Sequence, residues 1–114
     1  MATLGDLEEL QDGISASVQT LFRAYDQCAD PVESAAILIK AKQLAAQMAQ
    51  IETNMFHQQS IQTGPTVDRA FASAKDYTSQ LKTLSANLDR VSDIVATGTK
   101  LVDVVAQIVS WLLL

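Results

Sequence analysis

The stretch CADPVES, residues 28–34, separates one predicted helix from the next. Asp30 can accept hydrogen bonds from the first backbone N–H groups of a helix, and Pro31 has the fixed φ that suits the first helical position. Glu33, three residues after the cap, adds a second carboxylate where the helix dipole favours negative charge. The stretch therefore predicts a helix that begins at residue 31, after a short turn that ends the preceding helix.

On both sides of this turn, apolar residues recur at alternating three- and four-residue spacing, which is typical of helices that pack along one seam. This pattern predicts a first helix over residues 3–29 and a second over residues 31–62, which Gly64 and Pro65 end. Gly13 lies off the first seam and weakens that helix by about 1 kcal/mol relative to alanine without interrupting the pattern. The two seams consist of Leu4, Leu7, Ile14, Val18, Leu21, Tyr25 and Cys28, and of Ile37, Ala41, Leu44, Met48, Ile51 and Met55.

A third predicted helix covers residues 66–113 and carries the longest seam, which runs from Val67 to Leu112. Only Thr97, Gly98 and Thr99 interrupt it, because all three are mediocre or poor helix formers. Two interpretations follow: one continuous helix, or a break at residues 97–99, with Gly98 as the hinge candidate and a short fourth helix after it. We favour the continuous helix, because the spacing stays in phase across Gly98.

The composition agrees with long helices in a single domain over residues 1–114. Hydrophobic residues make up 48% of the chain and aromatic residues only 5%, while four glycines and two prolines leave few turns for a many-stranded sheet. Seams of this spacing stay in contact when helices cross at a shallow angle, as in a coiled coil, and short connections make neighbouring helices antiparallel. We therefore expect an all-α fold, an elongated antiparallel up-down helical bundle of three long helices.

The segment LVDVVAQIVSWLLL, residues 101–114, contains a single charged side chain, Asp103. Part of its apolar surface continues the seam, and Leu101, Val104, Ile108 and Trp111 form a second apolar face beyond it. A contiguous apolar face on the outside of a protein implies a partner. We expect an interaction face made of Leu101, Val104, Val105, Ile108, Val109, Trp111 and Leu112.

The sequence supplies no pattern typical of an enzyme, so we assign no catalytic, cofactor-binding or metal-binding residue. His57 has no partner at the spacing of a zinc site, and Asp89 and Asp93 lie beside the seam, where a solvated face explains them. No Gly-rich phosphate loop and no nucleophile paired with a base is present. We expect a protein that is not an enzyme and needs no cofactor.

The charge pattern argues against nucleic acid as a partner. Thirteen acidic residues against eight basic ones give a net charge of −5 and a pI near 4.5, and the basic residues are scattered singly. Binding to nucleic acid depends on clustered lysines and arginines. The first twelve residues are acidic and have no signal-peptide pattern, which predicts cytoplasmic synthesis and leaves leaderless export or membrane association open.

Three functions remain. The first is an interaction or structural protein that self-associates, or docks a helical partner, through its apolar C-terminal segment. The second is a membrane-active helical protein, pore-forming or membrane-inserting, that uses residues 91–114. Asp93, Lys100 and Asp103 argue against a simple membrane anchor. The third and weaker alternative is a secretion-linked filament subunit or a chaperone-bound component.

Overall fold

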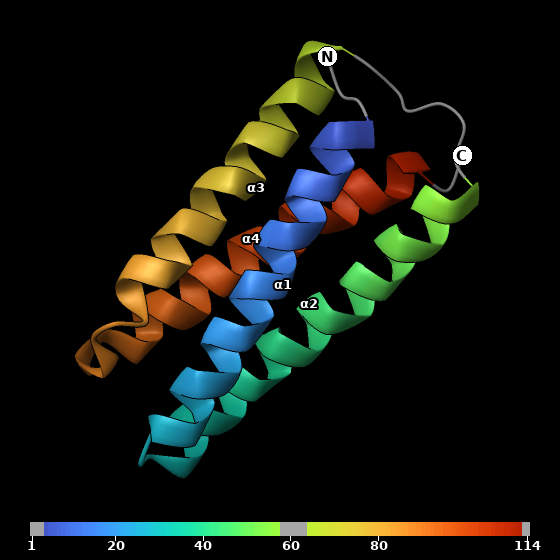
Figure 1. Ribbon diagram of the computed structural model, residues 1–114. Helices are drawn as coiled ribbons and strands as arrows, with labels where there is room; N and C mark the ends of the chain where they lie inside the picture. The colour runs from blue at the N-terminus through green and yellow to red at the C-terminus, as the bar shows by residue number, and fades with distance from the viewer. Residues whose placement is uncertain (1–3, 58–63, 113–114) are drawn as a thin grey trace.

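The computed structural model describes residues 4–57 and 64–112, and within these ranges the chain is helical except for short turns, with no strand. The four helices pack together (Figure 1): α1 spans Leu4–Gln27, α2 Pro31–His57, α3 Pro65–Leu84 and α4 Val91–Leu112, and a 3-10 turn, η1, spans Leu88–Arg90. The predicted all-α class is confirmed. The predicted helix ends at residues 3, 62 and 113 lie outside the described residues.

The turn between α1 and α2 is fixed by the Asp30 carboxylate. Its Oδ1 accepts hydrogen bonds from the backbone N–H groups of Val32, at 2.8 Å, and Glu33, at 3.0 Å. The backbone N–H of Ser34 then donates to the Asp30 carbonyl at 2.9 Å, which is the first hydrogen bond of α2. An aspartate in this position satisfies N–H groups that a helix leaves unpaired at its start.

The predicted single helix over residues 66–113 is wrong, because the chain turns at residues 85–87. The N–H of Ser85 donates to the Leu81 carbonyl, and the N–H of Asn87 to that of Leu84, which closes the end of α3. Asn87 has an extended backbone, with φ −133° and ψ 108°, and its side chain accepts a hydrogen bond from the N–H of Asp89. The third sequence segment is therefore two helices of similar length, α3 and α4.

The alternative of a break at residues 97–99 is wrong, since α4 runs through Gly98 without a break, as we favoured for that stretch. Gly98 is buried, and a Cβ atom placed on it would lie 3.4 Å from Cβ and from Cγ of Lys40 on α2. The Thr99 hydroxyl donates to the Val95 carbonyl at 2.9 Å within the helix. Gly98 thus marks a close approach of two helices, not a flexible joint.

The bundle is elongated, with extents of 45 × 23 × 17 Å, and each helix has two main neighbours. Helices α1 and α4 each pack against both α2 and α3 (Figure 1). The contact between α1 and α2 is the most extensive of these four, and the contact between α1 and α3 is the least. The α1–α3 side is therefore the loosest edge of the bundle.

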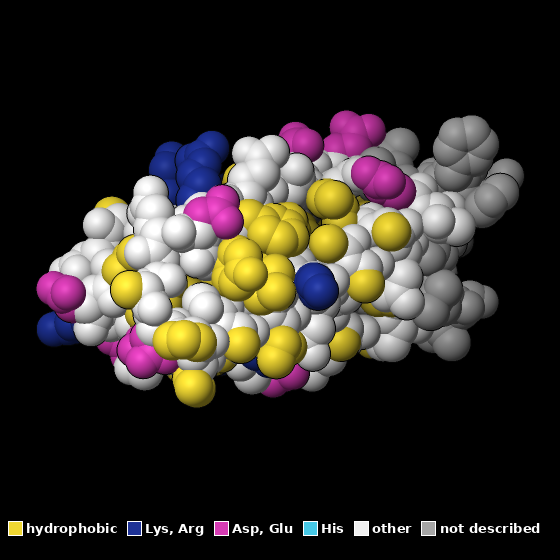
Figure 2. Space-filling view, turned by 90° about the horizontal axis from the view of Figure 1, so that it is seen from below, with side chains coloured by type: hydrophobic (Ala, Val, Ile, Leu, Met, Phe, Trp, Pro, Cys, Tyr) yellow, Lys and Arg dark blue, Asp and Glu magenta, His cyan; other side chains and the backbone are white. Residues whose placement is uncertain are grey.

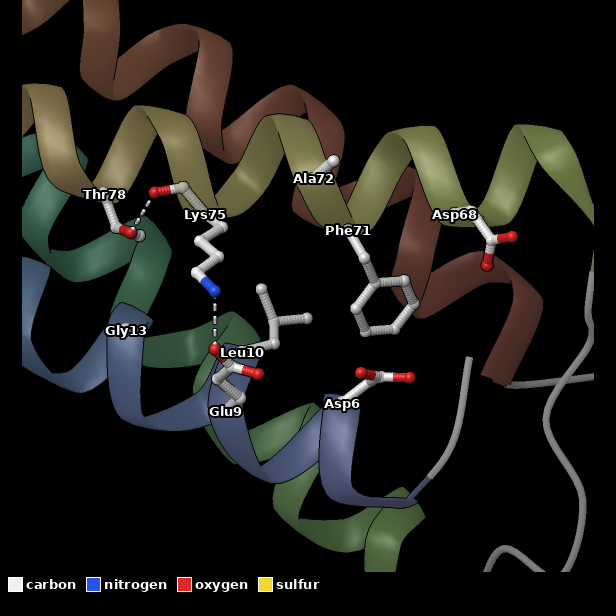
Figure 3. A pocket seen from close by; sticks show the side chains of 9 residues that line it. All are labelled: Asp6, Glu9, Leu10, Gly13, Asp68, Phe71, Ala72, Lys75 and Thr78. Carbon is white, nitrogen blue, oxygen red and sulfur yellow. Dashed lines mark hydrogen bonds and ion pairs between the residues drawn. The ribbon is translucent and has the colours of Figure 1, made fainter. Parts of the chain in front are cut away.

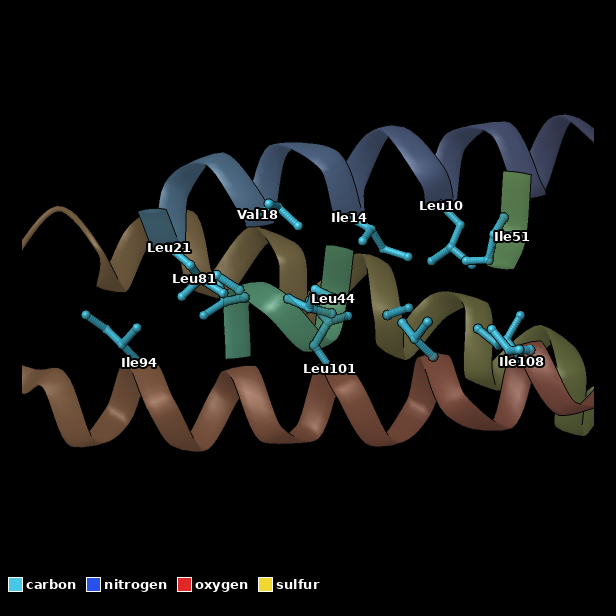
Figure 4. Close-up of a cluster of buried hydrophobic side chains, with 14 of the residues drawn as sticks. Leu10, Ile14, Val18, Leu21, Leu44, Ile51, Leu81, Ile94, Leu101 and Ile108 are labelled. Carbon is cyan, nitrogen blue, oxygen red and sulfur yellow. The ribbon is translucent and has the colours of Figure 1, made fainter. Parts of the chain in front are cut away.

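The core is aliphatic and contains residues from all four helices. Its largest fully buried side chains include Leu44 of α2, Leu81 of α3 and Leu101 of α4, which meet in the interior (Figure 4). Burial of an aliphatic side chain of this size contributes about 1.5–3 kcal/mol to folding, so the core is the main source of stability. The fully buried set is Leu7, Ile14, Leu21, Ile37, Leu44, Ile51, Leu81, Ile94, Leu101, Val105 and Ile108.

Candidate functional site

The predicted C-terminal interaction face lies mostly inside the bundle. Leu101 is 0% exposed and Ile108 1% exposed, and both belong to the core. Val105 and Val109 are buried as well, while Val104 and Trp111 are half-buried and pack against the core. The side chain of Leu112 lies outside the described part of the structure. The chain's own helices cover Leu101 and Ile108, which corrects the expectation that a partner covers them.

Helix α4 is nevertheless long and apolar enough to cross a membrane, by length and composition alone. The span Leu88–Trp111 has 24 residues; an 18-residue window within it has a mean hydropathy of 1.3, and 39% of that window is buried inside the bundle. A core helix of a soluble protein passes the same test. Its composition is therefore compatible with a membrane, and its position in the bundle is that of a core helix.

Exposed apolar side chains gather instead on the outer side of α2 and the first half of α4. Val32 is 79% exposed and Ile39 55% exposed, which is unusual for side chains of this type. An open groove of about 620 Å³ runs beside Val32. Figure 2 shows one side of the bundle on which hydrophobic side chains cluster among polar and acidic ones. We call the set Val32, Ala36, Ile39, Val95 and Ala96 the α2–α4 face.

The rim of that groove carries Glu33, Asp89 and Ser92. Nearby, Arg90 Nη1 lies 3.9 Å from Asp93 Oδ2, and the two side chains are 73% and 52% exposed. An ion pair this exposed contributes little to stability. Asp89 and Asp93 therefore belong to a solvated margin of the α2–α4 face.

A second groove, of about 560 Å³, lies between α1 and α3, the loosest edge of the bundle. Leu10, which is 6% exposed, and the half-buried Phe71 form part of its apolar wall (Figure 3). We call it the α1–α3 groove. It is lined by Asp6, Glu9, Leu10 and Gly13 of α1 and by Asp68, Phe71, Ala72, Lys75 and Thr78 of α3.

An ion pair between Lys75 and Glu9 crosses the α1–α3 groove. Lys75 Nζ lies 2.9 Å from Glu9 Oε1, and the two side chains are 75% and 61% exposed. The hydrogen bond and the negative charge of Glu9 raise the pKa of Lys75 above its ordinary value of 10.5. The carboxylates of Asp6 and Asp68 also line the groove, and both have interaction partners of their own.

Among the residues that the structure describes, no three His, Cys, Asp or Glu side chains come close enough together to hold a metal ion. The side chain of His57 is outside the described part. Cys28 is a free thiol whose Sγ lies 3.7 Å from the Asp30 carbonyl oxygen.

Sequence reasoning missed both grooves. Leu10 and Phe71 lie one residue outside the predicted seams, and Gly13 next to them in the fold has no side chain to fill the space. The available signal was that Leu10 and Phe71 are apolar although they lie beside a seam. Whether two such residues line one groove depends on which helices become neighbours, and the spacing does not determine that.

Comparison with known proteins gives no assignment: no protein-family model, no curated protein and no solved structure matches this chain.

Proposed function

We propose that the protein is a non-enzymatic helical interaction protein that self-associates through the α2–α4 face. The observation that carries the proposal is the exposure of Val32 and Ile39 on α2, where Val32 lies in the same groove as Val95 and Ala96 of α4. Removing an exposed Val or Ile side chain from water contributes about 1.5–3 kcal/mol. A surface of this kind is more stable when covered than when solvated.

The shape of α2 suits a second helix. Ala35 and Ala46 are exposed on the same side as Ile39, and small side chains let a neighbouring helix approach closely. We propose a second copy of this chain as the occupant, because closed twofold dimers that use one patch twice are the commonest oligomers. A second bundle laid against α2 would bury Val32 and Ile39 of both copies.

We also infer the finer fold arrangement, an elongated antiparallel up-down bundle. The three residues between α1 and α2 are too few to let α2 do anything but return along α1, and the turn at residues 85–87 joins α3 to α4 in the same way. Alternating helix directions leave the outer side of α2 unobstructed along its length.

The test is the molar mass in solution, by gel filtration with light scattering, of the wild type and of a Val32→Glu/Ile39→Glu double variant. The wild type should be a dimer, and the double variant a monomer with unchanged helical circular dichroism. Ser79→Glu, at an exposed position of α3, is the matched control and should stay dimeric. A monomeric wild type, or a dimer that the double variant retains, contradicts the proposal. Open filaments in electron micrographs would favour a filament subunit instead.

A second candidate function, membrane insertion, is favoured by the length and hydropathy of Leu88–Trp111. For this helix to insert, the bundle must open and release Leu101 and Ile108 from the core. The loose α1–α3 edge is where such an opening would begin, since it has the least contact to lose.

Dye release from liposomes tests this candidate with two alanine-to-aspartate variants. Ala106 is exposed on α4, so Ala106→Asp leaves the closed bundle intact. The new carboxylate lies inside the inserting segment, and the free-energy cost of inserting a charged residue reaches about 2.5–3.5 kcal/mol at the centre of a membrane helix. Ala86→Asp is exposed outside that segment and serves as the control. Insertion is supported if the wild type and Ala86→Asp release the dye and Ala106→Asp does not. Absence of release by the wild type, or equal release by both variants, contradicts it.

A further inference from the structure

The outer side of α2 carries a second repeat, opposite the one that faces the core. Exposed residues follow one another there at alternating three- and four-residue spacing, which is typical of a helix that pairs with another helix. The core positions Ile37, Leu44 and Ile51, by contrast, are 0% exposed. Three of the outer residues are alanines, which let a second helix approach closely. We call the outer repeat the α2 stripe; it consists of Val32, Ala35, Ile39, Lys42, Ala46, Ala49 and Thr53.

Charge divides the surface around the α2 stripe into two ends. Helices α2 and α4 begin side by side, and there the exposed Glu33 and Asp89 line the rim of the groove. Lys42 is exposed at the other end, about 15 Å from the start of α2 at 1.5 Å per residue. Arg90 at the acidic end pairs with Asp93, but within the described ranges Glu33, Asp89 and Lys42 form no ion pair. The surface therefore has an acidic end and a basic end, each with unpaired charge.

We infer that two copies of the chain pair through their α2 stripes in antiparallel orientation, the acidic end of each against the basic end of the other. This pairing geometry rests on the self-association proposed above. The twofold axis lies between Ala35 and Ile39, so that Ala35 faces the partner's Ile39 and Val32 faces the partner's Lys42. A parallel pairing would instead set like charges together, which is unfavourable.

The charges also select this register among those that the α2 stripe allows. The aliphatic stem of Lys42 covers Val32 of the other copy, and its ammonium group lies at the rim that carries Glu33 and Asp89. By twofold symmetry the same contact forms twice. A shift by one repeat of seven residues would place Lys42 over Ile39 and leave the rim carboxylates unpaired. Complementary charges across an interface fix register in this way.

The first test reverses the charges in one copy at a time. Lys42→Glu and Glu33→Lys each set like charges together at both contacts, so the dimer dissociation constant, from analytical ultracentrifugation, should rise by about tenfold or more. In an equimolar mixture of the two variants, both contacts join opposite charges, and dimers should form again with near wild-type affinity. Misfolded chains cannot produce this rescue. Lys82→Glu, exposed on α3, should dimerise like the wild type and, although it carries the same net charge as Lys42→Glu, should not rescue Glu33→Lys in a mixture.

A cross-linking experiment locates the twofold axis. Cys28→Ser removes the one cysteine of the chain, and the other cysteines are introduced in this background. A mixture of Ala35→Cys and Ile39→Cys chains should form a disulfide-linked heterodimer under mild oxidation, because the two positions face each other. A mixture of Ala35→Cys and Ala49→Cys chains is the control and should not. Equal yields from the two mixtures would overturn the register.

The outcomes separate this pairing geometry from self-association itself. If the wild type is a dimer and Val32→Glu/Ile39→Glu is a monomer, but the mixture of Lys42→Glu and Glu33→Lys stays as weak as either variant alone, self-association stands and the antiparallel register is wrong. A monomeric wild type overturns both.

Discussion

Residues 66–113 contain two short stretches with weak helix formers, residues 85–87 and residues 97–99. The helix breaks only at the first of them. Ala86 and Asn87 are exposed, and the Asn87 side chain caps the next turn through the N–H of Asp89. Thr97 and Gly98 are buried, and the Lys40 stem of α2 lies against Gly98.

The difference shows how helix propensity and packing compete. A glycine inside a helix costs about 1 kcal/mol relative to alanine, which is less than one buried leucine contributes. A break at Gly98 would separate the core residues Ile94 and Leu101, whereas a break at residues 85–87 folds α4 back over the apolar sides of α2 and α3. The chain therefore breaks where it gains the most burial.

The largest expected effect on stability is next to the buried stretch, residues 97–99. Leu101→Ala, one turn after Gly98, removes a fully buried side chain and should lower the free energy of unfolding by about 2–5 kcal/mol. Leu88→Ala, next to the exposed turn, removes a half-buried side chain and should cost clearly less. Urea unfolding followed by circular dichroism measures both. Similar losses for the two variants would contradict a rigid, packed α4 at residues 97–99.

The cap at the exposed turn gives the next largest effect. Asn87→Ala removes the side-chain acceptor for the Asp89 N–H, whose distance to Oδ1 is 3.0 Å, and should destabilise the protein by about 0.5–2 kcal/mol. Asn87→Asp keeps the acceptor and is the control; it should retain wild-type stability in the same urea titration. An unaffected Asn87→Ala variant would show that the turn is set by packing alone.

Gly98 itself should tolerate a methyl group. The Cβ of Gly98→Ala would contact Lys40 at 3.4 Å, an ordinary van der Waals distance, so the gain in helix propensity should raise stability by up to about 1 kcal/mol. Gly98→Leu cannot fit between the two helices and should be destabilising by about 1–3 kcal/mol. Thermal unfolding distinguishes the two directions. If Gly98 were a hinge that function requires, Gly98→Ala would also abolish dimerisation and liposome activity.

The smallest effect is expected at the loose α1–α3 edge. The Lys75 pKa is raised by Glu9, so the stabilisation from this pair is complete at pH below 10.5 and is lost as the pH rises through the higher pKa of the folded state. Glu9→Gln should therefore differ only slightly from wild type in the urea midpoint at pH 8, and the difference should vanish in the alkaline range. A large difference that persists above that range would assign Glu9 a role beyond this ion pair.

Much of the candidate site could not be predicted from spacing. The seams contain many of the core residues, for example Ile14, Leu44 and Leu81, because a helix repeats its inward side about every 3.6 residues whatever its partner. The same repeat does not say which helices become neighbours. Leu101 and Ile108 form a second apolar face in the sequence and lie in the core of the bundle, because α4 has helices on more than one side.

The sequence by itself determined the helical class and the start of α2, since periodicity and a capping aspartate act within a few residues of one another. The tertiary structure decided the turn at residues 85–87, the close approach at Gly98 and both grooves. These features depend on burial that accumulates between segments far apart in the chain, and such burial outweighs local preferences of about 1 kcal/mol.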